Sequence, residues 1–102
     1  MQISMTWPQL RRGECTYQGQ RVRLTRMECE VLSVLLMHRG RRVGLTMLIE
    51  AIYPDPDLEP DFAARCIMSI LWRTRQKVPG AIKSTHGWGW EVGLPVPMSM
   101  AA

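Results

Sequence analysis

The stretch from Arg65 to Lys77 constrains the fold most, because its apolar residues recur with the period of an α-helix. With Ile67 as the origin and about 100° per residue, the residues within about 40° of it are Leu71, Thr74 and Val78. The opposite side carries Arg65, Ser69, Trp72, Arg73 and Gln76. The pattern predicts a helix with one buried face and one exposed face that is suited to a partner. The alternative for the exposed face is an ordinary solvated helix surface.

A second helix is predicted to begin after Thr25. The segment Thr25-Arg-Met-Glu28 has the pattern of a capping box, in which the Thr25 hydroxyl accepts from the Glu28 N–H and the Glu28 carboxylate accepts from the Thr25 N–H. Apolar residues follow at helical spacing, namely Met27, Val31, Val34 and Leu35. We expect this helix to run to about His38 and to stop at Gly40.

Shorter elements are predicted around these two helices. Residues Cys15–Leu24 have the pattern of a hairpin that turns at Gln18-Gly19. Val43–Tyr53 is predicted as a shorter helix, with its inward residues at Leu45, Leu48, Ile49 and Ile52. The prolines at positions 54, 56 and 60 then force a loop, and Asp61 is the expected cap of the helix that follows.

A second hairpin is predicted over Ile82–Trp90, where Gly87 and Gly89 are expected to supply turn residues with positive φ. With 102 residues, of which 46% are apolar and 22% charged, the chain is predicted to be one globular domain. We divide it into an N-terminal segment over 1–13 that could include a short strand, a domain over 14–93, and a flexible tail over 94–102.

The order of strands, three helices and a hairpin resembles the OmpR/PhoB-type winged helix, the DNA-binding domain of many bacterial response regulators. Leu24-Thr-Arg-Met-Glu28 is similar to the L-T-x-x-E opening of that family, and Ile82–Trp90 is similar to its closing I-x-T-V-R-G-x-G-Y. Residues 65–78 resemble the family's third helix more loosely. The resemblance covers roughly residues 14–92. It implies an α+β fold with N-terminal β strands, a three-helix core and a C-terminal β-hairpin wing.

The resemblance also implies a DNA-binding transcriptional regulator, with the third helix in the major groove and the wing near the adjacent backbone or minor groove. Arg65 matches a position that contacts phosphate, and Trp72, Arg73 and Arg75 match positions that meet bases or phosphates. His86, which is largely neutral at neutral pH, stands in place of a minor-groove arginine. The predicted DNA-contacting residues are Arg65, Ser69, Trp72, Arg73, Arg75, Gln76, Lys77, Lys83, His86 and Trp88.

Two residues of the third helix depart from the family pattern and leave an alternative open. Ile70 replaces a histidine that faces DNA, and Trp72 replaces a polar or basic residue. Tryptophan is common at protein–protein hot spots, so the alternative is a winged helix used as an antiactivator or as an RNA-polymerase-binding factor. Trp72 could also pack against Trp88 or Trp90. The loop arginines Arg39, Arg41 and Arg42 could contact DNA or polymerase, or could simply be solvated.

Charge and composition fit a nucleic-acid partner without requiring one. The chain has 13 Lys and Arg against 9 Asp and Glu, a net charge of +4 and a pI near 9.4. No nucleophile is paired to a base by a motif, and Cys15, Cys29 and Cys66 do not have the spacing of metal ligands. We therefore expect no enzymatic activity, no cofactor and no metal.

Three reduced thiols, with Cys29 in the core, and the lack of a signal segment or membrane span predict a cytoplasmic protein. The resemblance to response regulators, together with the small size and the lack of a sensor, suits a bacterial or phage regulator. The sequence shows no receiver domain and no aspartate that resembles a phosphoacceptor, so phosphorylation in cis is not expected. A module of this size buries little DNA surface. We therefore expect specific binding to need a homodimer or a protein partner.

Overall fold

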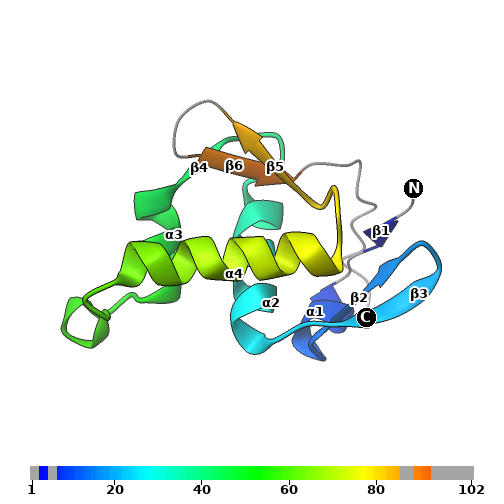
Figure 1. The fold of residues 1–102 in the computed structure, drawn as a ribbon, viewed down its shortest axis with the longest axis horizontal. Helices are drawn as coiled ribbons and strands as arrows, with labels where there is room; N and C mark the ends of the chain where they lie inside the picture. Colours follow the sequence, from blue (N-terminus) through cyan, green and yellow to red (C-terminus); the bar gives the residue numbers. More distant parts are fainter. Residues whose placement is uncertain (1–2, 5–6, 86–88, 93–102) are drawn as a thin grey trace.

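Two small antiparallel sheets lie beside a bundle of helices in the computed structural model (Figure 1), which describes residues 3–4, 7–85 and 89–92. The first sheet has the strand order β1-β2-β3 and the second the order β4-β6-β5. The elements are β1 (Ile3–Ser4), α1 (Trp7–Arg11), β2 (Glu14–Tyr17), β3 (Gln20–Arg23), α2 (Arg26–Met37), β4 (Val43–Gly44), α3 (Leu45–Ile52), the 3-10 helix η1 (Pro56–Leu58), α4 (Ala63–Lys77), β5 (Ile82–Thr85) and β6 (Gly89–Val92).

The first sheet contains the predicted hairpin. Its turn residues Gln18 and Gly19 have φ values of 52° and 80°, the positive pair that a tight type I′ turn between antiparallel strands requires. The short strand β1 pairs with β2, in the register Ile3 with Tyr17. Helix α1 was not predicted, and its residue Leu10 is buried in the core. Residues on both sides of position 14 therefore build the same sheet and core.

Helix α2 confirms the predicted capping box and the predicted end. The Glu28 N–H donates to the Thr25 hydroxyl over 3.2 Å, and the Thr25 N–H donates to the Glu28 carboxylate over 2.8 Å. The helix has His38 as its C-cap, and Gly40 follows at a φ of 81°. Local sequence therefore sets both ends of this helix.

Two predicted helix starts differ from the structure. Val43 begins β4 rather than a helix, because it pairs with Trp90 in the second sheet, and α3 starts only at Leu45. Asp61 does not cap α4, which starts at Ala63 without a side-chain cap. A cap of this kind occurs earlier in the loop, where the Asp55 carboxylate accepts from a backbone N–H over 3.0 Å and starts η1.

The core lies where α2, α3 and α4 meet and is closed by the second sheet. The buried residues of α4 are Ala63, Ile67, Ile70, Leu71 and Thr74. The Thr74 hydroxyl is buried but donates to the Ile70 carbonyl over 2.8 Å, so its burial leaves no unsatisfied donor. Ile70 is only 3% exposed, which corrects the interpretation that it lies on the face toward a partner. Cys29 is buried, as predicted.

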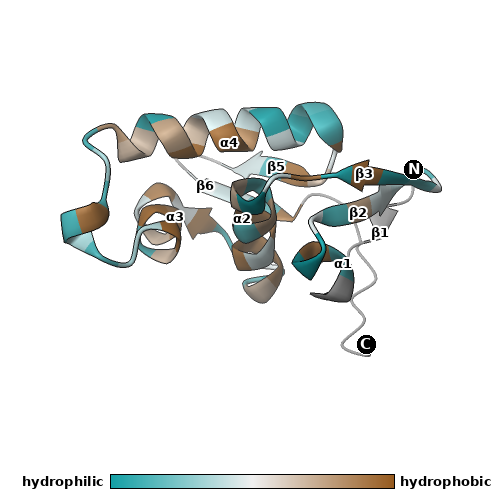
Figure 2. Cartoon of the chain, turned by 90° about the horizontal axis from the view of Figure 1, so that it is seen from below, coloured by the Kyte–Doolittle hydropathy of each residue, from teal (hydrophilic) through white to brown (hydrophobic). Residues whose placement is uncertain are grey.

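Helix α4 lies on one side of the domain, and α1 lies on the other (Figure 2). The loop with η1 lies at one end of the long axis and the hairpin β2–β3 at the other (Figure 1). The acidic residues of that loop are all exposed, namely Asp55, Asp57, Glu59 and Asp61. None of the helices in the described ranges is long and apolar enough to cross a membrane.

Candidate nucleic-acid interface

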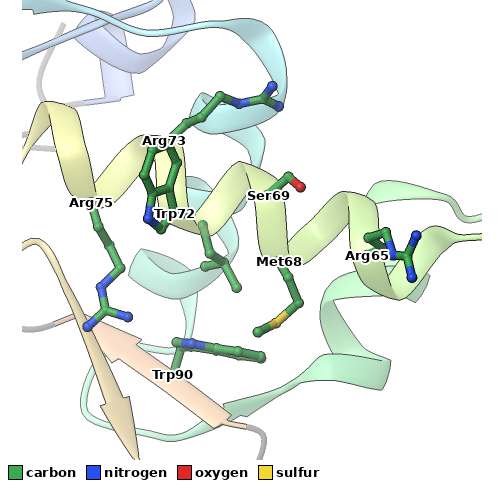
Figure 3. Close-up of a pocket in the computed structure, with 8 residues that line it drawn as sticks. Arg65, Met68, Ser69, Trp72, Arg73, Arg75 and Trp90 are labelled. Carbon is green, nitrogen blue, oxygen red and sulfur yellow. The ribbon is translucent and has the colours of Figure 1, made fainter.

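The exposed side of α4 forms a ridge between two grooves. A groove of about 550 Å³ faces the second sheet (Figure 3), and a groove of about 420 Å³ faces α2 and α3. The side chains that line both grooves are those of Arg65, Ser69 and Arg73, so they form the ridge. They are spaced four residues apart, which is roughly 6 Å along a helix. This ridge is the part of α4 best placed to enter a groove in a partner.

Arg65 and Arg73 place positive charge at the two ends of the ridge. The Arg65 guanidinium lies 5.5 Å from the centre of the Phe62 ring, in a cation–π arrangement at the start of α4. A cation is disfavoured at a helix N-terminus by the macrodipole, so helix stability does not explain Arg65.

Arg75 links α4 to the second sheet. Its guanidinium donates to the Ser84 hydroxyl of β5 over 3.0 Å, and Figure 3 shows the side chain directed toward that strand. On the same strand, the Lys83 ammonium lies 3.8 Å from the Glu91 carboxylate of β6. Both basic side chains are exposed, so they present charge along the sheet beside the helix.

Arg42, which the sequence left ambiguous, also joins the second sheet. Its Nε donates to the Thr85 hydroxyl over 3.1 Å. A Cβ on Gly89 would lie 2.0 Å from the Arg42 Nε and 2.7 Å from the Thr85 hydroxyl. Gly89 therefore makes room for Arg42, and it lies in strand β6, where it pairs with Thr85, instead of in the turn where it was predicted. Gly87, the other predicted turn residue, lies outside the described residues.

Solved structures with a similar arrangement identify the fold. The C-terminal domain of the nisin resistance regulator NsrR superposes with a TM-score of 0.68 at 24% identity, over 80% of this chain and 85% of that chain. The DNA-binding domain of CpxR from E. coli superposes with a TM-score of 0.63 at 22% identity, over 90% of this chain and 88% of that chain. DrrB from Thermotoga maritima, described as an OmpR/PhoB homolog, gives 0.65 at 25% identity, over 78% of this chain and 37% of that one. The chain has the OmpR/PhoB-type winged-helix fold.

This finding confirms the predicted fold class. The sequence itself matches no protein-family model and no curated protein. In the winged helix, α4 occupies the place of the third helix of the core, and the hairpin β5–β6 is the wing. The bond between Arg75 and Ser84 therefore joins helix and wing into one surface.

Lys77 differs from the other predicted contacts, because its partner inside the domain is a fully buried carboxylate. Its ammonium donates to the Glu28 carboxylate over 2.7 Å, and the Glu28 side chain is 0% exposed against 37% for Lys77. Burial raises the pKa of the Glu28 carboxyl, but the Lys77 and Thr25 hydrogen bonds outweigh that effect and bring the pKa below its ordinary value of 4.5. We therefore assign Lys77 a structural role, and its DNA contact stays a prediction.

The second partner of Glu28 could not be found from sequence. The capping box already explains a glutamate at this position, and Lys77 lies 49 residues away. The other Glu28 oxygen, Oε2, has no hydrogen-bond partner among the described residues, so the compensation for this buried charge comes through Oε1, from the Lys77 ammonium and the Thr25 N–H. The contact holds the end of α4 against the start of α2.

Most of the remaining predicted contacts lie on the exposed side of α4, beside the wing. All those within the described ranges are exposed, and the ones that line the groove toward the wing are Arg65, Ser69, Trp72, Arg73 and Arg75. Trp72 lines that groove together with Trp90 but stays 63% exposed, whereas Trp90 is a core residue with 5% exposure. Packing against Trp90 therefore does not bury Trp72. His86 and Trp88 lie outside the described residues.

Proposed function

We propose that this chain is a DNA-binding transcription regulator, in which α4 enters the major groove of double-stranded DNA and the wing rests on the adjacent backbone or minor groove. The observation that carries the proposal is the ridge of Arg65, Ser69 and Arg73. Helix α4 contains no acidic residue, so its exposed side presents positive charge alone. The CpxR structure with this fold is described as a DNA-binding domain, which supports the proposal.

The dimensions and chemistry of the ridge suit a duplex. An α-helix with its side chains is about 10–12 Å wide and fits a major groove about 12 Å wide. Each guanidinium can neutralise a phosphate or donate two hydrogen bonds to a guanine edge. We assign Ser69, Arg73 and Gln76 to the base edges, because they lie along the exposed side of α4.

Phosphate contacts are assigned to the basic residues around the ridge. Arg65 stands at the start of α4, and Arg75 and Lys83 stand at the junction with the wing. We add Arg42 to this group, because its bond to Thr85 holds it against the wing. His86 and Trp88 stay in the proposed contact set on the resemblance alone. A homodimer on DNA also remains part of the proposal.

The salt dependence of duplex binding tests the proposal. Contact with about 5 phosphates predicts that the logarithm of the binding constant falls with the logarithm of salt concentration at a slope near −4.5. Fluorescence anisotropy with a labelled mixed-sequence duplex measures this slope. Absence of binding at low salt, or a slope near zero, would contradict the proposal.

The second candidate is a winged helix that contacts a protein, such as RNA polymerase or another regulator. Exposed Trp72 favours it, since tryptophan is enriched at protein–protein hot spots. Ile70 no longer supports it, because that side chain is buried. A tight complex with polymerase in a pull-down, together with no salt-dependent duplex binding, would favour this second function.

A further inference from the structure

Two exposed apolar side chains form a flank of α4 beside the ridge. Met68 and Trp72 lie four residues apart, are 37% and 63% exposed, and line the groove toward the wing. The floor of that groove is made by the buried residues Leu71 and Trp90, and Figure 3 shows Met68 directed toward the Trp90 indole. Most of the Trp72 surface faces water, so core packing does not account for a tryptophan here.

The charges around this apolar flank determine which partner it suits. Among the described residues, the charged ones that line the groove are all arginines, Arg65, Arg73 and Arg75. An apolar strip inside a purely cationic frame is complementary to a polyanion that also offers an apolar group. A duplex fits this description, because phosphates border its grooves on both sides.

The major groove offers one apolar group among the standard bases. Each base pair presents donors and acceptors there, and only thymine adds a methyl group, at C5. We infer that Trp72 and Met68 form a subsite for thymine methyl groups, so that the regulator prefers duplexes that carry them. This inference rests on the proposed DNA binding and adds the base that the helix selects.

Alternating polymers test the inference without knowledge of an operator. Poly(dA-dT) and poly(dA-dU) have the same hydrogen-bonding edges and differ only in the C5 methyl group. Because the methyl recurs at every second base of each strand, any register of the protein meets it. We expect about fourfold tighter binding for each methyl group removed from water. Poly(dG-dC) with cytosine methylated at C5 should bind more tightly than the unmethylated polymer, because that methyl occupies the same groove.

Variants separate recognition of the methyl from a change in duplex shape. In Trp72→Ala the preference for poly(dA-dT) over poly(dA-dU) should fall close to one. In Leu58→Ala, which removes a 77% exposed apolar side chain from the distant loop, the preference should stay that of the wild type. Circular dichroism and thermal unfolding establish that both variants fold.

The outcomes distinguish failure of the thymine subsite from failure of the proposed DNA binding. Equal binding of the wild type to all four polymers, with the expected salt dependence, would overturn the thymine subsite and leave DNA binding in place. The same preference in the wild type and in Trp72→Ala would also overturn it, because the preference would then belong to the duplex. Binding to none of the polymers would overturn the proposed function and the subsite with it.

Discussion

The buried and exposed sides of α4 follow different rules, although their residues alternate along one helix. On the buried side, Ile67 and Leu71 pack against α2 and α3, and their positions follow directly from the helical period. On the exposed side, the same period predicts which polar residues are exposed, but it does not predict what each of them contacts. Arg65 and Arg73 extend from the ridge, whereas Lys77 is bound to Glu28 inside the domain.

This difference shows that exposure along a helix does not by itself define a binding surface. Lys77 and Arg73 lie four residues apart and both are exposed. Lys77 stabilises the buried Glu28 carboxylate, whereas Arg73 lines both grooves of α4. Substitutions should therefore separate them: changes on the buried side and at Lys77 should affect unfolding, and changes on the ridge should affect binding.

The largest effect is expected from a cavity on the buried side. Ile67→Ala removes a fully buried side chain and should lower the free energy of unfolding by about 2–5 kcal/mol. Urea denaturation followed by circular dichroism measures the change. Met68→Ala is the matched control, since the adjacent residue is 37% exposed and should change stability by less than about 0.5 kcal/mol. Equal losses in the two variants would show that the two sides are not distinct.

The next largest effect is expected at Lys77. Lys77→Met removes the charged hydrogen bond to Glu28 and should lower the free energy of unfolding by about 1.5–3 kcal/mol. Lys83→Met is the control, because its pair with Glu91 is 3.8 Å long and largely exposed, and its loss should cost less than about 1 kcal/mol. If the free energy of unfolding falls equally in the two variants, the burial of Glu28 does not strengthen its ion pair with Lys77.

The Lys77 effect should also depend on pH. Because folding lowers the pKa of Glu28, the stabilisation from this group is present above the ordinary value of 4.5 and is lost as the pH falls through the lower folded value. The stability difference between the wild type and Lys77→Met should therefore narrow below pH 4.5. Urea denaturation at a series of pH values measures it. A difference that stays constant into acid would mean that Glu28 does not contribute through its charge.

The sequence predicts the features that depend on neighbouring residues and misses those that depend on distant ones. The capping box at Thr25 and the turn at Gly19 are local, and both are confirmed. Strand β4 has only two residues and exists because it pairs with β6, so no periodicity could reveal it. The contact between Arg42 and Thr85 joins residues 43 positions apart, so it was likewise invisible in the sequence pattern.

On the ridge, the expected effect is on binding alone. Arg73→Ala should weaken binding to duplex DNA by about 1–3 kcal/mol and leave the urea midpoint unchanged. Arg12→Ala is the matched control, because it removes the same charge near α1, on the other side of the domain (Figure 2), from a residue paired with Glu14. Fluorescence anisotropy at constant salt compares the two. Equal weakening would mean that net charge, rather than the ridge, determines the affinity.

The smallest effect should come from the bond that links helix and wing. The Ser84 hydroxyl accepts a hydrogen bond from the Arg75 guanidinium and so orders that side chain before DNA binds. In Ser84→Ala the Arg75 side chain must be ordered during binding, so we expect duplex binding to weaken by about 0.5–1.5 kcal/mol. A double-mutant cycle with Arg75→Ala isolates this contribution. Once Arg75 is absent, removal of the Ser84 hydroxyl should change the affinity no further. An equal loss with and without Arg75 would show that Ser84 contacts the duplex itself, and that the wing contributes to binding independently of α4.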